Sequence, residues 1–246
     1  FEILFLKFIW SCLPTVALAK VGFLGSFLTE GSFQLIAQLI NANKEEIIFT
    51  SGATESINTA IKGIAGAYGH KKNHIIACAT EHLAVLDTLE TLNKKGFEIT
   101  VLPVNRSGQI DLEQLKNAIT EKTLMAYIMH ANNETGTIHP IKEIAKILHE
   151  HDVLFFCDAT QSAGKIVVDV KDDDIDLLCL SAHKMYGPKG VGALYIKNKR
   201  PKINLIPLID GGGHQHGMRS GTLNVTGIVG LGKACEIAMN SMWDDG

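Results

Sequence analysis

The sequence predicts an α/β fold with a mostly parallel sheet and helices on both faces. Between residues 46 and 196, short apolar runs alternate with amphipathic segments of helical length, which is the pattern of successive βαβ units. Polar residues follow directly after several of the apolar runs, as they do at the carboxyl ends of parallel strands. No internal repeat or low-complexity segment interrupts the pattern, so we expect this section to form one domain.

The first two strand–helix units are clear from hydrophobic periodicity. The apolar runs over 46–50 and 74–78 are short and rich in isoleucine, as buried strands are. A helix is predicted over 54–68, where isoleucine and alanine recur at intervals of three and four residues. A second helix over 84–95 is ended by Gly96, a residue type that commonly follows a helix.

The middle of the chain adds three strands and two helices. Apolar runs predict strands over 97–102, 124–129 and 153–158. The helix over 111–119 begins at an aspartate, whose carboxylate can accept the free N–H groups of the first turn. The helix over 140–149 begins at a proline and carries its apolar residues on one face.

The last elements surround a turn that is rich in glycine and proline. An apolar run over 175–180 leads into this turn, and a second run over 193–196 follows it. This pattern predicts a strand, a tight turn and another strand. A final helix is predicted over 225–239.

The composition limits the partners and the compartment. Of 246 residues, 46% are hydrophobic and 20% charged, and the formal net charge is -3 with a pI near 6.4. These values give no basic footprint, so nucleic acid is not expected as a partner. The cysteines are widely spaced and form no CxxC pair, so we expect buried free thiols in a reducing compartment. They are Cys12, Cys78, Cys157, Cys179 and Cys235.

The first 34 residues are strongly apolar and receive no structural assignment. Charged residues and Pro14 interrupt them, so no membrane span and no membrane association are expected. The triplet over 17–19 resembles a signal-peptide cleavage site, but the basic segment that precedes such sites is missing. We therefore divide the chain into an apolar leader, 1–34, and a domain, 35–246.

Two neighbouring strand ends carry the residues expected to do chemistry. Lys184 lies where the 175–180 run opens into its loop, and a lysine partly removed from water there can act as a nucleophile. Asp158 ends the preceding strand, with Gln161 just beyond it. Such a pair suits pyridoxal phosphate, because a lysine forms the Schiff base and an aspartate pairs with the pyridinium nitrogen. A surface lysine, or a structural ion pair of Asp158 with Lys184, would give the same pattern.

Three other strand ends carry weaker signals. Ser51 and Thr54 flank a helix start, where free backbone N–H groups make either a phosphate site or a plain N-cap. His82 follows the second strand and can stack on a flat ring and move protons, or simply cap its helix. Asn133 lies in an Asn/Gly turn, and its amide can bond a ring oxygen or a substrate carboxylate, or serve only the turn.

A glycine-rich loop over 211–222 is the last candidate. Arg219 is suited to a bidentate contact with a carboxylate, and Thr222 to a contact with a phosphate. His214 and His216 lack a supporting set of cysteine or carboxylate ligands, so no metal is expected. A flexible surface connection would also explain this loop. Because most of the candidates follow separate strands, one cofactor lying across the sheet edge explains them economically.

With these residues assembled, the chain resembles the cysteine desulfurases of the class V, fold-type I pyridoxal-phosphate family. The combination of SAHK, GPKG and RSGT favours desulfurases over other class V aminotransferases. The resemblance implies a fold-type I large domain with most of the small domain missing. The matching stretches are FTSGATES (49–56), TEHLAVLDT (80–88), MHANNETG (129–136), CDATQSAGK (157–165), SAHKMYGPKGVGALY (181–195) and GGGHQHGMRSGTLN (211–224).

The resemblance also implies a role for each site residue. Lys184 would form the Schiff base, and His82 would stack on the ring and assist proton transfer. Asp158 would hold the pyridinium nitrogen, Gln161 the phenolate oxygen, and Asn133 the ring oxygen or the substrate. Arg219 remains the candidate for the substrate carboxylate. The phosphate would be held by Ala53, Thr54, Ser181 and His183, and in a homodimer also by Thr222 from across the interface.

The implied reaction takes sulfur from L-cysteine and leaves L-alanine and an enzyme-bound persulfide for iron–sulfur clusters or tRNA thiolation. Sulfur-acceptor or iron–sulfur scaffold proteins would be partners, in the cytoplasm or, in a eukaryote, in mitochondria. Two departures from the family pattern stand out. The leader replaces the usual N-terminal segment, and the loop with the catalytic cysteine would lie beyond Gly246. We therefore expect a chain truncated at both ends and inactive as a fragment.

Two alternative functions stay open at this point. A related class V lyase or aminotransferase, such as a selenocysteine lyase, would share these motifs, and substrate profiling would separate the two. A truncated product that folds or dimerises without catalysis would be marked by the absence of bound cofactor.

Overall fold

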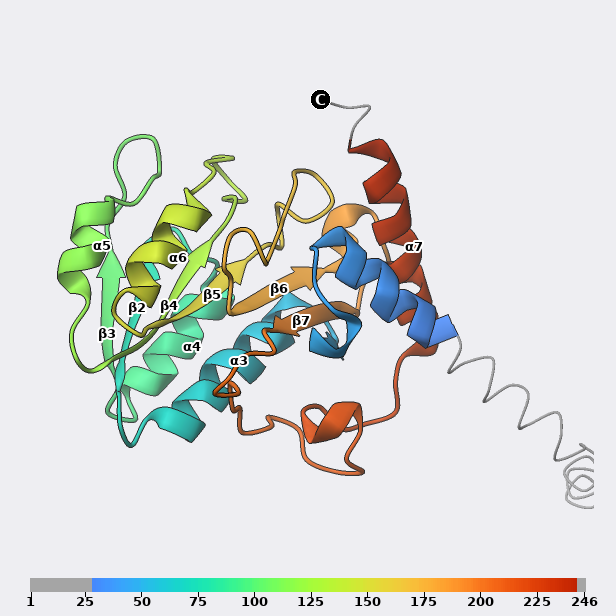
Figure 1. Cartoon of the computed structure of the whole chain (residues 1–246), viewed down its shortest axis with the longest axis horizontal. Helices are drawn as coiled ribbons and strands as arrows, with labels where there is room; N and C mark the ends of the chain where they lie inside the picture. Colours follow the sequence, from blue (N-terminus) through green and yellow to red (C-terminus); the bar gives the residue numbers. More distant parts are fainter. Residues whose placement is uncertain (1–27, 243–246) are drawn as a thin grey trace, which may run out of the picture.

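The computed structural model describes residues 28–242, which form a seven-stranded sheet with helices on both faces (Figure 1). The strand order is β1-β7-β6-β5-β4-β2-β3. Strand β7 runs antiparallel to both of its neighbours, and the other pairs are parallel, so the predicted mostly parallel α/β sheet is confirmed. The strands are β1 (Ile47–Thr50), β2 (His74–Cys78), β3 (Glu98–Leu102), β4 (Thr123–Met129), β5 (Leu154–Asp158), β6 (Leu177–Ser181) and β7 (Gly192–Ile196).

Each face of the sheet has its own apolar core beneath its helices. On one face, α3 and α4 bury Ile61 and Leu89. On the other face, α5, α6 and α7 bury Leu115, Ile144 and Leu231. The helices are α3 (Ala53–Tyr68), α4 (Leu83–Asn93), α5 (Leu112–Ala118), α6 (Ile141–His149) and α7 (Val225–Ser241), with short 3-10 turns η1 (Lys44–Glu46), η2 (Ala182–Met185) and η3 (Gln215–Gly217).

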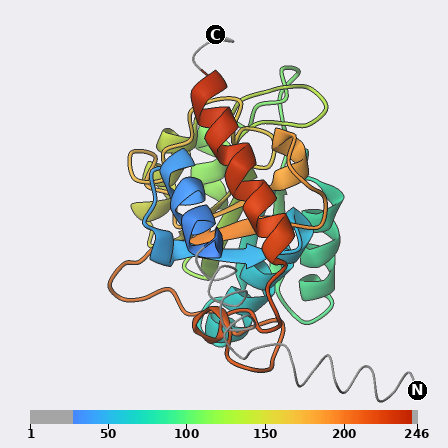
Figure 2. The same ribbon diagram turned by 90° about the vertical axis from the view of Figure 1, so that its right-hand side faces the viewer.

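A further helix over residues 28–39 lies beside α7 (Figure 2). The two helices approach closely at Gly232, where an added Cβ would stand 2.7 Å from Ser32 Oγ. Residues 28–34 of this helix belong to the segment that received no assignment from the sequence, and residues 1–27 and Cys12 lie outside the described part. No helix within residues 28–242 is both long enough and apolar enough to cross a membrane.

The observed boundaries differ from the predicted ones by at most two residues. Glu46, predicted as the start of a strand, instead ends η1, because its carboxylate accepts the Asn43 N–H at 2.8 Å in a capping box. Asp111 caps α5 as predicted, accepting the Glu113 N–H at 2.8 Å. The predicted buried free thiols are also confirmed for the four cysteines that the structure describes.

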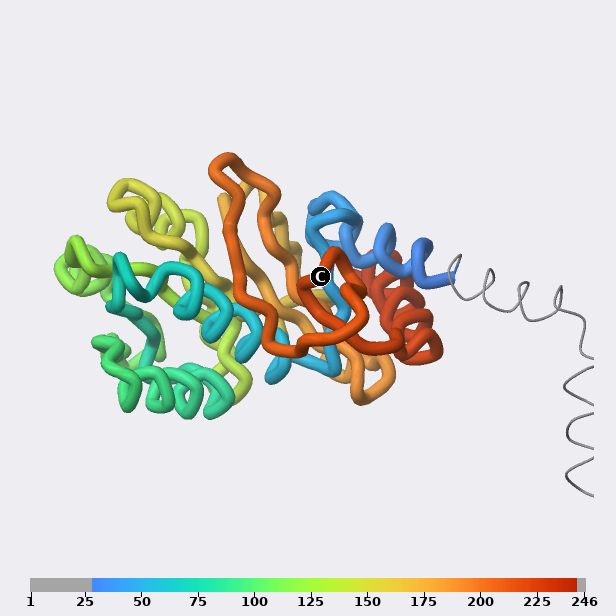
Figure 3. Tube along the Cα trace, turned by 90° about the horizontal axis from the view of Figure 1, so that it is seen from below, coloured from blue at the N-terminus to red at the C-terminus, as the bar shows by residue number. Residues whose placement is uncertain are grey.

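The segment between β7 and α7 crosses beneath the sheet (Figure 3). Its first part runs along α3, where the Ile206 N–H donates to the Gly63 carbonyl at 3.1 Å. Its second part reaches the edge strand β1. There the Gln215 side chain donates to the Phe49 carbonyl at 3.0 Å and accepts the Phe49 N–H at 2.6 Å. This glutamine therefore covers the backbone groups that an edge strand leaves unpaired.

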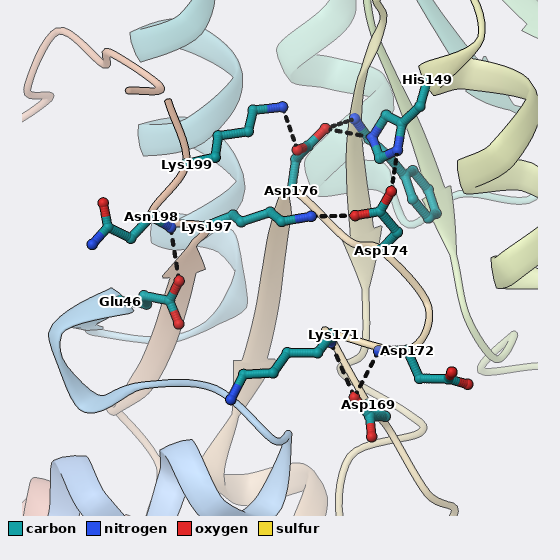
Figure 4. A network of polar contacts seen from close by, with 11 residues as sticks. Glu46, His149, Asp169, Lys171, Asp172, Asp174, Asp176, Lys197, Asn198 and Lys199 are labelled. Carbon is teal, nitrogen blue, oxygen red and sulfur yellow. Dashed lines mark hydrogen bonds and ion pairs between the residues drawn. The ribbon is translucent and has the colours of Figure 1, made fainter. Parts of the chain in front are cut away.

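A charged network ties the helices to the sheet at the amino end of β6 (Figure 4). His149, at the end of α6, lies 2.8 Å from Asp174 and 2.9 Å from Asp176 through its two ring nitrogens. Asp176 is fully buried, and it also receives Lys199 at 2.6 Å and the Phe155 N–H at 3.0 Å. The hydrogen bond to Asp176 is the main cause that raises the pKa of His149 above its ordinary value.

This network predicts a stability that falls as pH rises. Since the pKa of His149 is higher in the folded than in the unfolded chain, its contribution is complete below the ordinary value of 6.5. The contribution is lost as pH rises through the raised folded value. We expect His149→Gln to cost about 1 kcal/mol below that range and less above it, as measured by urea unfolding across the pH range. A penalty that grows with pH would contradict this expectation.

Candidate active site

A cavity of about 620 Å³ opens where the carboxyl ends of several strands meet the start of α3. All the sequence-predicted site residues except Arg219 and Thr222 line this cavity. The structure therefore brings together side chains that follow β1, β2, β4, β5 and β6. The lining residues among the predicted set are Ala53, Thr54, His82, Asn133, Asp158, Gln161, Ser181, His183 and Lys184.

The start of α3 presents backbone donors to the cavity. Its N-cap is Gly52, so the plain cap by Ser51 or Thr54 that the sequence left open is not formed, and no side chain caps the helix. Gly52 has a φ of 146°, a conformation that favours glycine. The neighbouring strand β7 leaves room for this turn only because Gly192 lacks a side chain, since an added Cβ would stand 2.7 Å from the Gly52 Cα. Uncapped N–H groups at a helix start are suited to bind an anion.

His82 caps its helix, which is one of the two readings that the sequence left open, and it also faces the cavity. It is the N-cap of α4, and its Nδ1 accepts the Ala84 N–H at 3.0 Å. It also lines the cavity. Because Nδ1 is an acceptor, the neutral ring carries its proton on Nε2.

Asp158 is held by two donors at the end of β5. Its Oδ1 accepts the Thr160 N–H at 2.8 Å, and its Oδ2 accepts the Tyr127 hydroxyl at 2.9 Å. Asp158 is only 6% exposed, and its partners are these groups rather than Lys184. Tyr127 is itself fixed by an edge-on contact with Phe156 at a ring-centroid distance of 4.6 Å. The carboxylate is therefore held in a fixed position in the cavity lining.

Lys184 lies on η2, directly after β6, and is exposed rather than partly desolvated as expected. The short turn of η2 carries the chain out of the sheet before the lysine is reached. Three residues before Lys184, the Ser181 hydroxyl lies 2.9 Å from His183 Nδ1. Burial and the nearby lysines lower the pKa of His183, which favours the neutral form of the ring. Lys189 is a second lysine in the cavity lining.

The two amide candidates have one side of the amide engaged and the other still available. Gln161 Oε1 accepts a bond from Lys165 at 3.0 Å, which leaves the Gln161 NH2 group for the cavity. Asn133 Nδ2 donates to the Glu134 carboxylate at 2.6 Å. The preceding Asn132 builds the turn instead, donating to the Thr80 carbonyl at 3.1 Å and so tying this loop to the turn that carries His82.

A buried carboxyl group, Glu81, lies between these elements. It is 5% exposed, and its Oε1 accepts the Met129 N–H at 2.9 Å. Its Oε2 has no hydrogen-bond partner within the described residues. Burial, reinforced by the negative charge of Asp158, raises the pKa of Glu81 well above its ordinary value. Glu81 therefore fastens the turn before α4 to the end of β4, in surroundings that favour its protonated form.

Arg219 and Thr222 lie outside the cavity lining. Arg219 forms two contacts with Glu55, with Nε 2.8 Å from Oε1 and Nη2 3.3 Å from Oε2. Glu55 itself lines the cavity. Thr222 is exposed on the loop before α7.

The sequence analysis did not identify the residues that hold the candidate site residues and their loops in place. Tyr127 looked like one more core residue of an apolar strand, although a buried tyrosine hydroxyl needs a partner and could have signalled one. Glu81 was visible only as the neighbour of His82. Glu55 gave no signal at all, because its partner lies 164 positions away in the sequence.

The aminotransferase class-V family matches residues 26–244 of the chain. The chain belongs to this family. Its members depend on pyridoxal phosphate, and the fold-type I architecture expected for them agrees with the sheet described above.

Relatives of known sequence are named as cysteine desulfurases. The cysteine desulfurase IscS of Anaeromyxobacter sp. (strain Fw109-5) is 55% identical over 209 residues, which is 85% of this chain and 52% of that protein. A probable mitochondrial cysteine desulfurase of Dictyostelium discoideum is 51% identical over 224 residues, which is 91% of this chain and 50% of that protein. The chain thus spans about half the length of these relatives.

Solved structures agree with the same family. DndA from Streptomyces lividans superposes with a TM-score of 0.88 at 37% identity, covering 92% of this chain and 64% of that one. SspA, solved in complex with cysteine, has a TM-score of 0.84 at 44% identity, covering 87% of this chain and 62% of that one.

Proposed function

We propose that this chain forms the part of a cysteine desulfurase that binds pyridoxal phosphate and L-cysteine. The reaction takes sulfur from L-cysteine and leaves L-alanine. One observation carries the proposal: a single cavity combines the uncapped start of α3, the buried carboxylate of Asp158 and the amine of Lys184. The names of the relatives, and a related structure described with cysteine, point to the same substrate.

The phosphate end of the cofactor fits the start of α3. Ala53 and Thr54 lie in the first turn, where the backbone donors lack a side-chain cap. The Ser181 hydroxyl and the His183 ring face the same cavity from the end of β6. A helix start flanked by hydroxyl and imidazole groups offers the donors that a phosphate requires.

The ring of the cofactor would be held by His82 and Asp158, which both line the cavity. Asp158 presents a fixed negative charge to a ring nitrogen, since Tyr127 and Thr160 hold both of its oxygens. The Gln161 NH2 group is available for a ring oxygen, because Lys165 occupies its carbonyl. His82 holds its proton on Nε2 and so can donate a hydrogen bond into the cavity.

Lys184 is the residue suited to bind the cofactor covalently through Nζ. Bound pyridoxal phosphate supplies an electron sink that allows a proton to leave the α-carbon of an amino acid. Lys184 and His82 both line the cavity and can carry protons at Nζ and Nε2. Arg219 remains a candidate for the substrate carboxylate only if it leaves Glu55.

The described cysteines do not supply the thiol that accepts sulfur. Cys78, Cys157, Cys179 and Cys235 are all buried. Burial raises the pKa of Cys235 to about 12 and the pKa values of Cys157 and Cys179 well above the ordinary value. A thiol that attacks sulfur must reach the cavity as a thiolate. The described residues therefore account for the cofactor-dependent step and not for sulfur acceptance.

A homodimer and a sulfur-accepting or iron–sulfur scaffold protein belong to the same proposal. The exposed Thr222 is free to reach a second copy of the chain rather than its own cavity. A cytoplasmic or mitochondrial location accords with this reaction, and one relative is named as mitochondrial.

The direct test is to trap the cofactor on Lys184. The protein is mixed with pyridoxal phosphate, reduced with borohydride, and digested for peptide mapping by mass spectrometry. We expect labelling at Lys184 that is absent from Lys184→Ala and retained in Lys189→Ala, a matched control because both lysines line the cavity. Prior addition of L-cysteine should reduce the labelling, because the substrate amine competes with Nζ. Labelling at Lys189, or scattered over surface lysines, would refute the proposal.

A further inference from the structure

The proposed phosphate cradle contains a carboxylate that would repel a phosphate. Glu55 is the third residue of α3 and lines the cavity. Its Oε2 accepts the Ser51 N–H at 2.8 Å, so it closes the turn from which the helix begins. A full negative charge in the first turn competes with a phosphate for the same positive helix end. Glu55 thus fixes the shape of the turn, but it also places a negative charge where a phosphate would bind.

The guanidinium of Arg219 compensates the negative charge of Glu55. Its guanidinium contacts both oxygens of Glu55, at 2.8 and 3.3 Å. The side chains are only 20% and 11% exposed, so solvent screens the pair weakly. Although burial raises the pKa of Glu55, the bonds from Arg219 and Ser51 outweigh it and lower the pKa, which keeps the group ionised.

Arg219 is held in this position by its own loop. Gln215 fastens the loop to the backbone of Phe49, which lies two residues before Ser51. The adjacent Ser220 is only 4% exposed, and its N–H donates to the Ile209 carbonyl at 3.3 Å. The arginine is therefore presented to Glu55 by a fixed segment rather than by a freely moving side chain.

We infer that Glu55 and Arg219 act together as positioning residues for the phosphate end of the site. Glu55 fixes the turn by accepting the Ser51 N–H, and Arg219 neutralises Glu55 so that the helix start can receive a phosphate. This assigns Arg219 a contact with a protein carboxylate in place of the substrate carboxylate. The inference rests on the proposed function, because it assumes that a phosphate-bearing cofactor occupies the cavity.

A double-mutant cycle tests the inference. The dissociation constants of pyridoxal phosphate, and of pyridoxal, which lacks the phosphate, are measured for the wild type, Arg219→Gln, Glu55→Gln and the double variant. Arg219→Gln should weaken pyridoxal phosphate about tenfold or more, because it leaves Glu55 uncompensated. The double variant should recover to within about threefold of the wild type, since both charges are gone. Pyridoxal should change by less than about twofold throughout, because it has no phosphate to repel.

Two further variants guard against trivial explanations. Arg106→Gln removes the same charge from an exposed loop and should leave both affinities unchanged. Arg219→Lys keeps the charge without the two-pronged contact and should bind pyridoxal phosphate more tightly than Arg219→Gln. If Arg219→Gln fails to fold, Arg219→Lys is compared with the wild type instead, and it should weaken pyridoxal phosphate more than pyridoxal. Inorganic phosphate can also be used as a competitor of pyridoxal phosphate in each variant. Its binding does not depend on Lys184, because it forms no covalent bond with an amine.

The outcomes separate the inference from the proposed function. If the double variant is as weak as Arg219→Gln, or if pyridoxal weakens equally, charge cancellation is wrong, even when the wild type binds normally. Equal affinities for Arg219→Lys and Arg219→Gln would also overturn it. If the wild type neither binds pyridoxal phosphate nor labels at Lys184, the proposed function fails as well.

Discussion

Asp158→Asn is expected to lower the rate of cofactor-dependent α-proton exchange by at least about a hundredfold. The substitution removes the negative charge that, under the proposed function, would pair with the ring nitrogen, and it keeps the shape of the side chain. Its amide oxygen can still accept the Thr160 N–H, and its NH2 group can donate to the Tyr127 hydroxyl oxygen. We therefore expect a folded protein that has lost a charge rather than a site that has collapsed.

The measurement is loss of the α-proton signal of L-alanine in deuterated water, followed by nuclear magnetic resonance. This exchange needs no thiol and so isolates the step to which the described residues contribute. Tyr127→Phe is the matched control, because it removes one hydrogen bond to Asp158 and keeps the charge. Its effect should be about tenfold or less. Equal losses for the two variants would mean that the position of Asp158, rather than its charge, sets the rate.

Glu81→Gln is expected to stabilise the protein above neutral pH by about 2 kcal/mol. The pKa of Glu81 is raised in the folded chain, chiefly by burial. Folding therefore favours the protonated acid, and the wild type loses stability as pH rises from the ordinary value of 4.5 through the folded value. Glutamine has no charge to bury and keeps an oxygen for the Met129 N–H. The gain should vanish below the ordinary value, where both residues are neutral.

Urea unfolding of both proteins at several pH values measures this gain. Glu81→Ala is the contrasting variant, because it also removes the charge but leaves the Met129 N–H without its acceptor. We expect it to be destabilised by about 1–3 kcal/mol relative to Glu81→Gln. A glutamine variant that is less stable than the wild type at high pH would show that Glu81 is ionised in the folded protein.

The sequence was sufficient to predict the sheet and the convergence of most candidate site residues on one cavity, for a shared physical reason. Buried parallel strands need continuous apolar runs, and the residues just beyond them are placed at one sheet edge by the topology. Asp158, His82 and Lys184 could therefore be expected to converge before any contact was known. The same logic located the turn after β1. It did not predict that Gly52 would be the N-cap and leave α3 without a side-chain cap.

Contacts between distant segments were beyond this reasoning. A bidentate arginine suits any carboxylate, so nothing local told whether Arg219 would meet a substrate or Glu55. The partner of the Tyr127 hydroxyl is set by the register of β4 against β5. An apolar strand sequence does not reveal that register. The exposure of Lys184 depends on η2, a single turn too short to leave a periodic signal.

The placement of β7 has a consequence for biosynthesis. Strand β1 lies at the sheet edge, and its one neighbour in the described sheet is β7, with Ile47 opposite Tyr195. The turn at the start of α3 therefore leaves the ribosome early but gains its place beside Ser181 only after β7 has been made and inserted. Such a distant pairing forms slowly. A nascent chain should thus be unable to assemble this cavity until most of the domain has been synthesised.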